Sequence, residues 1–212
     1  MLLRLLLSTV LLLGLTACDA NAEKFEEGKH YEVVSATGSE TPKVQEFFSF
    51  YCGHCYRFAP VARNLAANIP ADIPFEKVHV DFMAAAPAEM QQALSRAYLV
   101  GKELGQADMV AGLIFNYIHQ QGAGFNSDSD IRNLLLVNDI DAAAFDAKFN
   151  SLPILSAVQT MKEQQIKWSE NGVLKGVPTL IVNGRYKVNY AALEPEQFEA
   201  DLQALVNFLL TK

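Results

Sequence analysis

The chain has 212 residues, 50% of them hydrophobic, which is enough to bury the core of one domain or of one domain with an insertion. Its 17 basic and 24 acidic residues give a formal net charge of −7. Loss of residues 1–22 would remove one base, Arg4, and one acid, Asp19, and leave the net charge unchanged. This composition disfavours a disordered chain, and the acidic balance disfavours a nucleic-acid-binding protein.

Residues 1–22 have the order of a secretory signal peptide: Arg4, the apolar run 5–15, and then small residues. Two cleavage sites compete. Ala20-Asn21-Ala22 fits the small-x-small pattern and would release a soluble protein, whereas Leu15-Thr16-Ala17-Cys18 resembles a bacterial lipobox and would leave a lipidated Cys18. We expect an exported protein, with the soluble form favoured and the lipoprotein as the alternative.

The first half of the mature chain predicts a strand, a helix and a second, parallel strand. A weak edge strand fits residues 31–34, and the aromatic and β-branched run 44–51 reads as a buried strand that leads directly into Cys52. Apolar residues then recur at helical spacing, with a kink expected at Pro60, and residues 75–82 alternate as in a strand.

The middle of the chain, from residue 87 to about residue 172, has helical periodicity throughout. Asp141 is expected to cap one helix, and Ser127 or Asp128 the helix before it. We therefore expect about five helices in succession.

Strand patterns return at 179–182 and 185–188 around Asn183-Gly184, which is a strong signal for a two-residue hairpin, and an amphipathic helix is expected over 194–210. The order of elements predicts an α/β protein, a thioredoxin-like fold with an inserted all-helical domain. The expected boundaries are a signal peptide at 1–22, the first part of the thioredoxin-like domain at 23–84, the helical insertion at 85–160 and the second part at 161–212.

Cys52-Gly53-His54-Cys55 opens the first expected helix and predicts a redox-active pair. Residues three apart on a helix are neighbours, so the two thiols can form a reversible disulfide. The unsatisfied N–H groups at a helix start favour an anion and should lower the pKa of Cys52, and His54 should stabilise the same thiolate. Cys55, one turn deeper, is the expected resolving thiol.

Other interpretations of these residues are weaker. Half of a zinc site would need a second pair of ligands, but apart from Cys18 the chain has no further cysteine, and its other histidines are scattered at 30, 79 and 119. We therefore expect no metal and no cofactor. His79 and Trp168 are more simply explained as residues of the core or its edge.

Three segments resemble the DsbA family of bacterial periplasmic oxidases: residues 46–55, which end in the cysteine motif, residues 78–83, and Gly176-Val177-Pro178-Thr179. The resemblance covers essentially the whole mature chain. It implies a periplasmic monomer that donates its disulfide to reduced or unfolded exported proteins and is reoxidised by a membrane quinone reductase like DsbB. One departure is Gly53, where the family usually has proline, so that the motif takes the form seen in eukaryotic protein disulfide isomerases.

The resemblance also assigns roles to residues outside the cysteine motif. Val177 and Pro178 match the family's cis-proline loop, which packs against the disulfide and presents the backbone of Val177 to an extended substrate. Glu46 and Lys77 fall on adjacent expected strands and match a buried acid and base that relay protons from Cys55. For the latter pair, two solvated charges at strand ends are the alternative.

Two other functions remain open from the sequence. Gly53 favours a disulfide isomerase or reductase. A periplasmic chaperone that binds unfolded segments without redox turnover is the alternative from another class, and it would keep its activity after Cys52→Ala.

Overall fold

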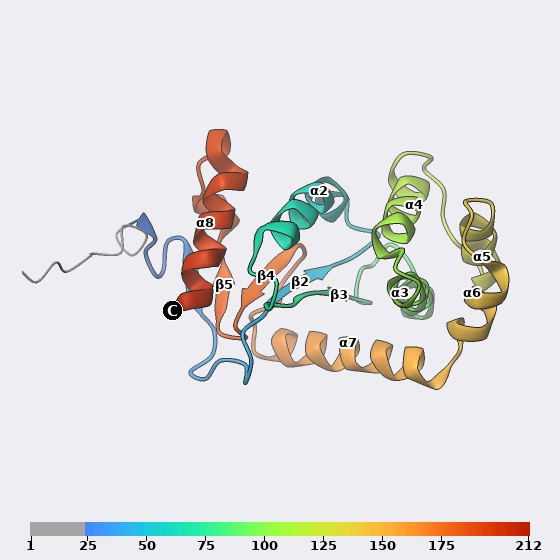
Figure 1. Cartoon of the computed structure of the whole chain (residues 1–212), viewed down its shortest axis with the longest axis horizontal. Helices are drawn as coiled ribbons and strands as arrows, with labels where there is room; N and C mark the ends of the chain where they lie inside the picture. Colours follow the sequence, from blue (N-terminus) through green and yellow to red (C-terminus); the bar gives the residue numbers. More distant parts are fainter. Residues whose placement is uncertain (1–23) are drawn as a thin grey trace, which may run out of the picture.

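The computed structural model describes residues 24–212 (Figure 1), so the signal peptide and Cys18 lie outside the described residues. Five strands and seven α-helices make up this part of the chain: β1 Tyr31–Val33, β2 Val44–Phe48, α2 Gly53–Asn68, β3 Phe75–His79, α3 Ala88–Glu103, α4 Ala107–His119, α5 Asp128–Leu136, α6 Ala142–Phe149, α7 Leu152–Glu170, β4 Thr179–Val182, β5 Tyr186–Val188 and α8 Phe198–Thr211. The expected α/β order is confirmed, with five helices, α3 to α7, between β3 and β4. None of the helices within residues 24–212 is long and apolar enough to cross a bilayer.

The strands form one mixed sheet in the order β1-β5-β4-β2-β3. β2 and β3 are parallel, as the β-α-β pattern predicts, and the other neighbours are antiparallel. All five residues of β2 are buried, because the strand lies inside the sheet and both of its faces are covered. The strand that leads to the cysteines is therefore held on both edges and both faces.

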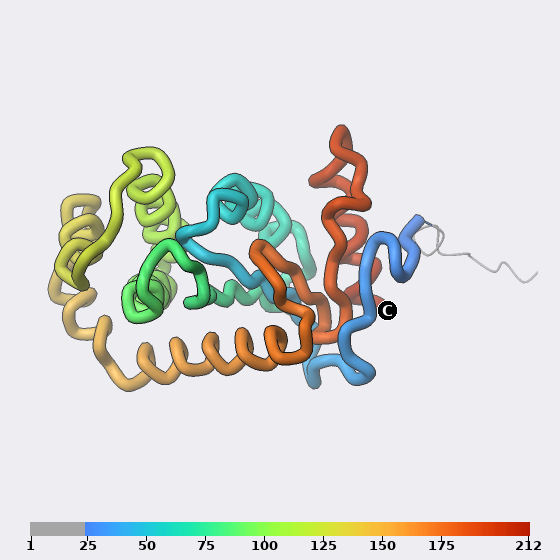
Figure 2. The backbone as a smooth tube through the Cα atoms, turned by 180° about the vertical axis from the view of Figure 1, so that it is seen from behind, coloured from blue at the N-terminus to red at the C-terminus, as the bar shows by residue number. Residues whose placement is uncertain are grey.

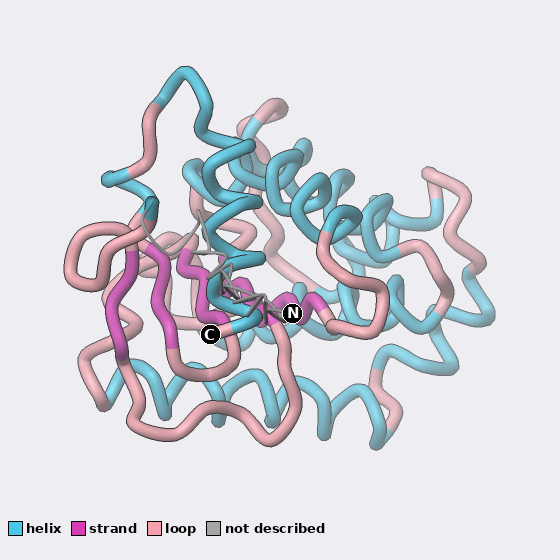
Figure 3. The backbone as a smooth tube through the Cα atoms, turned by 60° about the vertical axis from the view of Figure 1, so that its left-hand side comes forward, coloured by secondary structure: helices cyan, strands magenta, loops and turns pink. Residues whose placement is uncertain are grey.

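Helices cover the two faces of this sheet. In Figures 1 and 2, α2 lies above the strands, α8 stands beside them next to β5, and α7 runs below them. Alternate residues of β4 serve the two sides: Leu180 and Val182 join the core formed with α2 and α8, and Ile181 joins the core that contains Trp168 of α7. Figure 3 shows α7 passing beneath the group of strands.

The helices α3 to α6 form a separate group at one end of the molecule, and α7 leads from it back to the sheet (Figure 1). α7 continues without interruption through residues 160 and 161, the expected boundary between the insertion and the second part of the thioredoxin-like domain. We therefore propose that the chain returns to the thioredoxin-like part along this helix rather than at one residue.

Several local expectations can be compared with the structure. The hairpin is confirmed, since Asn183 and Gly184 both have positive φ, 53° and 58°. Ser127 is the cap of α5, in a reciprocal capping box with Asp130. The last helix, however, starts at Phe198 rather than at residue 194, because Pro195–Gln197 form a 3-10 turn first.

The packing of α3 against α4 requires a glycine. A Cβ on Gly101 would lie 2.6 Å from Cγ2 of Val110, so we expect Gly101→Ala to lower the free energy of unfolding by about 1 to 3 kcal/mol. Gly112→Ala, on α4, is the matched control, because nothing lies within 4 Å of its added Cβ. This control should stabilise the protein by up to about 1 kcal/mol in urea unfolding, and equal effects of the two changes would contradict the packing.

Candidate redox site

The loop between β2 and α2 is fixed by two histidines from other parts of the chain. The N–H of Phe50 donates to Nε2 of His79 at 3.1 Å, and Nε2 of His119 donates to the carbonyl of Phe50 at 2.8 Å. Burial lowers the pKa of His79 to about 3, so its ring is neutral and its Nε2 remains an acceptor. The backbone N–H and carbonyl of Phe50, two residues before Cys52, are thus each fixed by a hydrogen bond to a histidine.

Cys52 is the N-cap of α2. Its Sγ accepts the N–H of Cys55 at 3.3 Å and, as a thiol, donates to the carbonyl of Val177 at 3.3 Å. Both cysteines are free thiols in this structure, and Cys52 is 8% exposed against 1% for Cys55. The arrangement confirms that the first cysteine is the more accessible of the two.

The two thiols have opposite acidities. The pKa of Cys52 falls from 9.0 to about 6, mainly because the Cys55 S–H donates to the Cys52 sulfur; the N–H groups of Cys55 and His54 and the charge of His54 add to this, and burial opposes it. The pKa of Cys55 is strongly raised by its S–H hydrogen bond to Cys52 and then by burial. At neutral pH the pair therefore holds one thiolate, on Cys52, and one proton, on Cys55.

The side chain of His54 is exposed, and its charge makes the smallest contribution to the lowered pKa of Cys52. We expect His54→Leu to raise the Cys52 pKa by less than about 1 pH unit, because solvent screens the imidazole. Cys55→Ala, which removes the main donor, should raise it further than Cys55→Ser, which keeps a donor. The pKa of Cys52 in all three variants is measured from thiolate absorbance through a pH titration. A larger rise of this pKa in His54→Leu than in Cys55→Ala would contradict the assignment.

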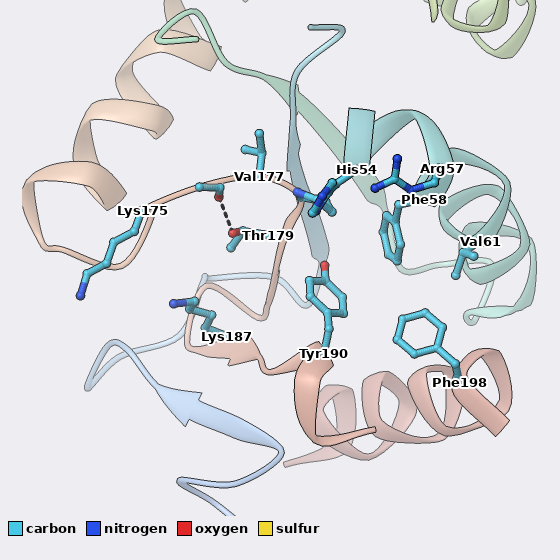
Figure 4. A pocket seen from close by; sticks show the side chains of 12 residues that line it. His54, Arg57, Phe58, Val61, Lys175, Val177, Thr179, Lys187, Tyr190 and Phe198 are labelled. Atoms are coloured by element: carbon cyan, nitrogen blue, oxygen red, sulfur yellow. Dashed lines mark hydrogen bonds between the residues drawn. The ribbon is translucent and has the colours of Figure 1, made fainter. Parts of the chain in front are cut away.

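The loop before β4 faces the cysteines. The Val177-Pro178 peptide bond is cis, and the hydroxyl of Thr179 donates to the carbonyl of Gly176 at 2.8 Å (Figure 4). A cleft of about 650 Å³ lies beside this loop, between the start of α2 and the segment that follows β5. Val177 and His54 both line this cleft, so it opens next to Cys52.

Glu46 and Lys77 are directly opposite each other in the β2–β3 register and form an ion pair. Their side chains are 1% and 14% exposed, so they are not two solvated strand-end charges. Within residues 24–212 the second carboxylate oxygen of Glu46, Oε1, has no hydrogen-bond partner, and the charge of Glu46 contributes to the raised pKa of Cys55. Glu46 is therefore close enough to the buried thiol for its charge to act on Cys55.

Three residues of the site were not singled out as functional in the sequence. His119 comes from α4, Arg57 lies one turn into α2, and Tyr190 follows β5 with its hydroxyl buried and without a partner in the described part of the chain. Burial, followed by the charges of Glu46 and Cys55, raises the pKa of Tyr190. Only Arg57, at helical spacing from the cysteines, had a sequence signal that would have placed it here.

Gly53, the departure noted above, occupies the first position of α2. An added Cβ would lie 3.8 Å from Nη1 of Arg57, which is ordinary van der Waals contact. The first position of a helix also tolerates proline. The fold therefore does not require glycine here.

Comparison with known proteins supports the same family along nearly the whole chain. A family model described as the DSBA-like thioredoxin domain matches residues 43–203. The thiol:disulfide interchange protein DsbA of Dickeya dadantii is 33% identical over 202 residues, covering 92% of this chain and 93% of that protein. DsbA of Escherichia coli K12 is 33% identical over 190 residues, covering 88% of each.

Solved structures agree with the sequence comparison. The disulfide oxidoreductase DsbA of Proteus mirabilis has a TM-score of 0.75 and 30% identity, covering 89% of this chain and 98% of that one. A variant of it, solved with a non-covalently bound peptide PWATCDS, has a TM-score of 0.76 and 29% identity, covering 89% and 99%. By its fold, its sequence and the cysteine pair at the start of α2, the chain belongs to the DsbA family and is a thiol-disulfide oxidoreductase.

Proposed function

We propose that the Cys52–Cys55 disulfide is donated to cysteines of newly exported proteins in the bacterial periplasm. The observation that carries this proposal is the asymmetry of the pair, a pKa of about 6 for Cys52 beside a buried Cys55 whose pKa is raised. Stabilising the thiolate of Cys52 stabilises the reduced protein, and an oxidant is a disulfide whose reduced form is stabilised. The site therefore favours giving a disulfide away over keeping it.

The transfer takes two steps. A substrate thiolate attacks Sγ of Cys52, the bond between Cys52 and Cys55 breaks, and Cys55 leaves as a thiolate that takes up a proton. A second substrate thiolate then attacks the substrate sulfur of this mixed disulfide and releases the Cys52 thiolate. Two electrons pass from the substrate dithiol to the protein, and no cofactor takes part.

Val177 and Pro178 have the substrate-binding role in this proposal. A relative has been solved with the non-covalently bound peptide PWATCDS, which contains a cysteine, and in the present chain a cleft lies beside the Val177-Pro178 loop. An extended segment placed along Val177 would bring its cysteine to Cys52, because the Val177 carbonyl is already 3.3 Å from that sulfur. Backbone pairing of this kind suits an unfolded substrate of any sequence.

Glu46 and Lys77 have the proton-relay role. We expect Glu46→Gln to slow oxidation of the reduced protein by a small neutral disulfide about tenfold or more, because Cys55 must then lose its proton without a nearby base. The pH profile of that rate should also change. Glu76→Gln is the matched control, since Glu76 is the neighbouring carboxylate on β3 and binds Lys43 and Gln45 instead. An unchanged pH profile in Glu46→Gln would leave Glu46 with a structural role alone.

The cycle closes when an oxidant removes the two electrons. We propose a DsbB-like quinone reductase of the membrane in this role, and a monomer in the periplasm as the working form. Family membership supports this assignment. Among the described residues Cys52 and Cys55 are the only thiols, so the electrons must pass to another molecule.

A reduced, unfolded protein with two cysteines tests the proposal directly. One equivalent of the oxidised protein should remove two substrate thiols, and Cys52→Ala should remove none. If the protein acts only on substrates whose disulfides are already mispaired, the isomerase is favoured. If Cys52→Ala still suppresses aggregation of the substrate and no thiols are lost, the chaperone is favoured.

A further inference from the structure

The cleft beside the cis-proline loop carries charges of one sign. Its charged lining residues are Arg57, Lys175 and Lys187, His54 also lines it, and no carboxylate does. The chain as a whole is acidic, with a net charge of −7, so this basic lining does not follow from composition. The rest of the lining is largely apolar, including Phe58 and Phe198.

Two of these cations have no acidic partner in the part of the chain that the structure describes. No carboxylate of residues 24–212 lies within 4.0 Å of Arg57 or Lys175, whereas Lys187 has only the exposed Glu32, at 3.8 Å. The side chains of Arg57 and Lys175 are exposed to solvent. They are therefore available to a charged ligand without first breaking an ion pair.

The positions of these cations relate them to the reacting sulfur. Nη1 of Arg57 lies 3.8 Å from where a Cβ of Gly53 would be, and so it lies over the residue next to Cys52. Lys175 precedes Val177 by two residues, and Figure 4 shows it across the cleft from Arg57. Because an extended chain advances about 3.3 Å per residue, both positions lie within two or three residues of a substrate cysteine held at Cys52.

From this geometry we propose that the cleft selects substrate segments that carry an aspartate or glutamate within about three residues of the reactive cysteine. The inference rests on the proposed function and adds a charge preference to it. A carboxylate on one side of the cysteine pairs with Arg57, one on the other side pairs with Lys175, and Phe58 and Phe198 contact the apolar neighbours of the cysteine. The redox step itself is unchanged.

Three peptides test this preference, identical except for Asp, Asn or Lys two residues from a single cysteine. The rate at which each reduces the Cys52–Cys55 disulfide is divided by its rate with neutral hydroxyethyl disulfide, which corrects for the thiol pKa of each peptide. We expect the Asp peptide to react about threefold faster than the Asn peptide, from one solvent-exposed ion pair, and the Lys peptide to react more slowly. The preference should shrink at high salt.

Variants then test which side chains cause the preference for the Asp peptide. The double change Arg57→Gln with Lys175→Gln should bring the ratio of the Asp and Asn rates close to one, and Lys102→Gln, on α3, should leave it as in the wild type. Equal rates for the Asp and Asn peptides in the wild type would overturn the inference and leave the proposed oxidase intact. Failure of every peptide to reduce the disulfide would instead count against the proposed function.

Discussion

Cys55→Ala should convert almost completely into a stable mixed disulfide with a single-cysteine substrate, through Cys52 alone. The variant is first loaded with a small aromatic disulfide, so that the substrate thiolate displaces the aromatic thiol and forms a bond to Cys52. No resolving thiol is then present on either partner, and the adduct persists. Non-reducing gels and mass spectrometry of the adduct measure its yield and locate the bond.

Cys52→Ala is the matched control for this trap. Cys55 is 1% exposed, and burial still raises its pKa after its hydrogen bond to Cys52 is lost, so the remaining thiol is inaccessible and largely protonated. We expect only traces of adduct from this variant under the same conditions. Adducts that form on Cys55 as readily as on Cys52 would reverse the roles assigned to the two cysteines.

The stability of the reduced protein should rise relative to that of the oxidised protein as the pH is raised. The pKa of Cys52 is depressed from 9.0 to about 6 in the fold, so its contribution is complete above the unfolded value and is lost as pH falls through about 6. The full depression corresponds to about 4 kcal/mol, and screening by solvent around the sulfur reduces this to roughly 2 kcal/mol. In a chain of this size that shifts the melting temperature by roughly 4 to 8 °C.

Thermal melts of both redox forms at about pH 5, 7 and 9 measure this difference. Groups present in both forms, such as the buried His79, largely cancel, whereas Cys55 ionises only in the reduced form and, because its pKa is raised in the fold, offsets part of the gain near pH 9. Reduced Cys52→Ser keeps the fold without an ionisable group at this position, and its melting temperature should follow the oxidised protein across the range. A difference in melting temperature between the reduced and oxidised forms that stays constant with pH would mean that Cys52 carries no stabilised thiolate.

Local chemistry accounts for the parts of the structure that the sequence predicts well. Asn183-Gly184 specifies a hairpin because both residues tolerate positive φ, and the cysteine spacing specifies neighbouring thiols as soon as a helix starts at Gly53. The family's cis bond at Val177-Pro178 follows from the resemblance and is present in the structure. These features depend on a few consecutive residues.

The residues that the sequence did not reveal depend on contacts between distant segments. His119 reaches Phe50 from α4, and the hydroxyl of Tyr190 becomes buried only when the segment after β5 packs against Phe58 of α2. Periodicity assigns such residues to an element, but it does not say which loop they will meet.

The reduction potential of the Cys52–Cys55 pair is the most direct test of the proposed direction of electron flow. It is measured by equilibrating the protein with mixtures of reduced and oxidised glutathione at pH 7 and quantifying the two forms by mass spectrometry after acid quenching. With a stabilised Cys52 thiolate, we expect a potential above about −200 mV, more oxidising than the cytosolic glutathione pool. A potential near that of thioredoxin, about −270 mV, would make the protein a reductant and would contradict the account.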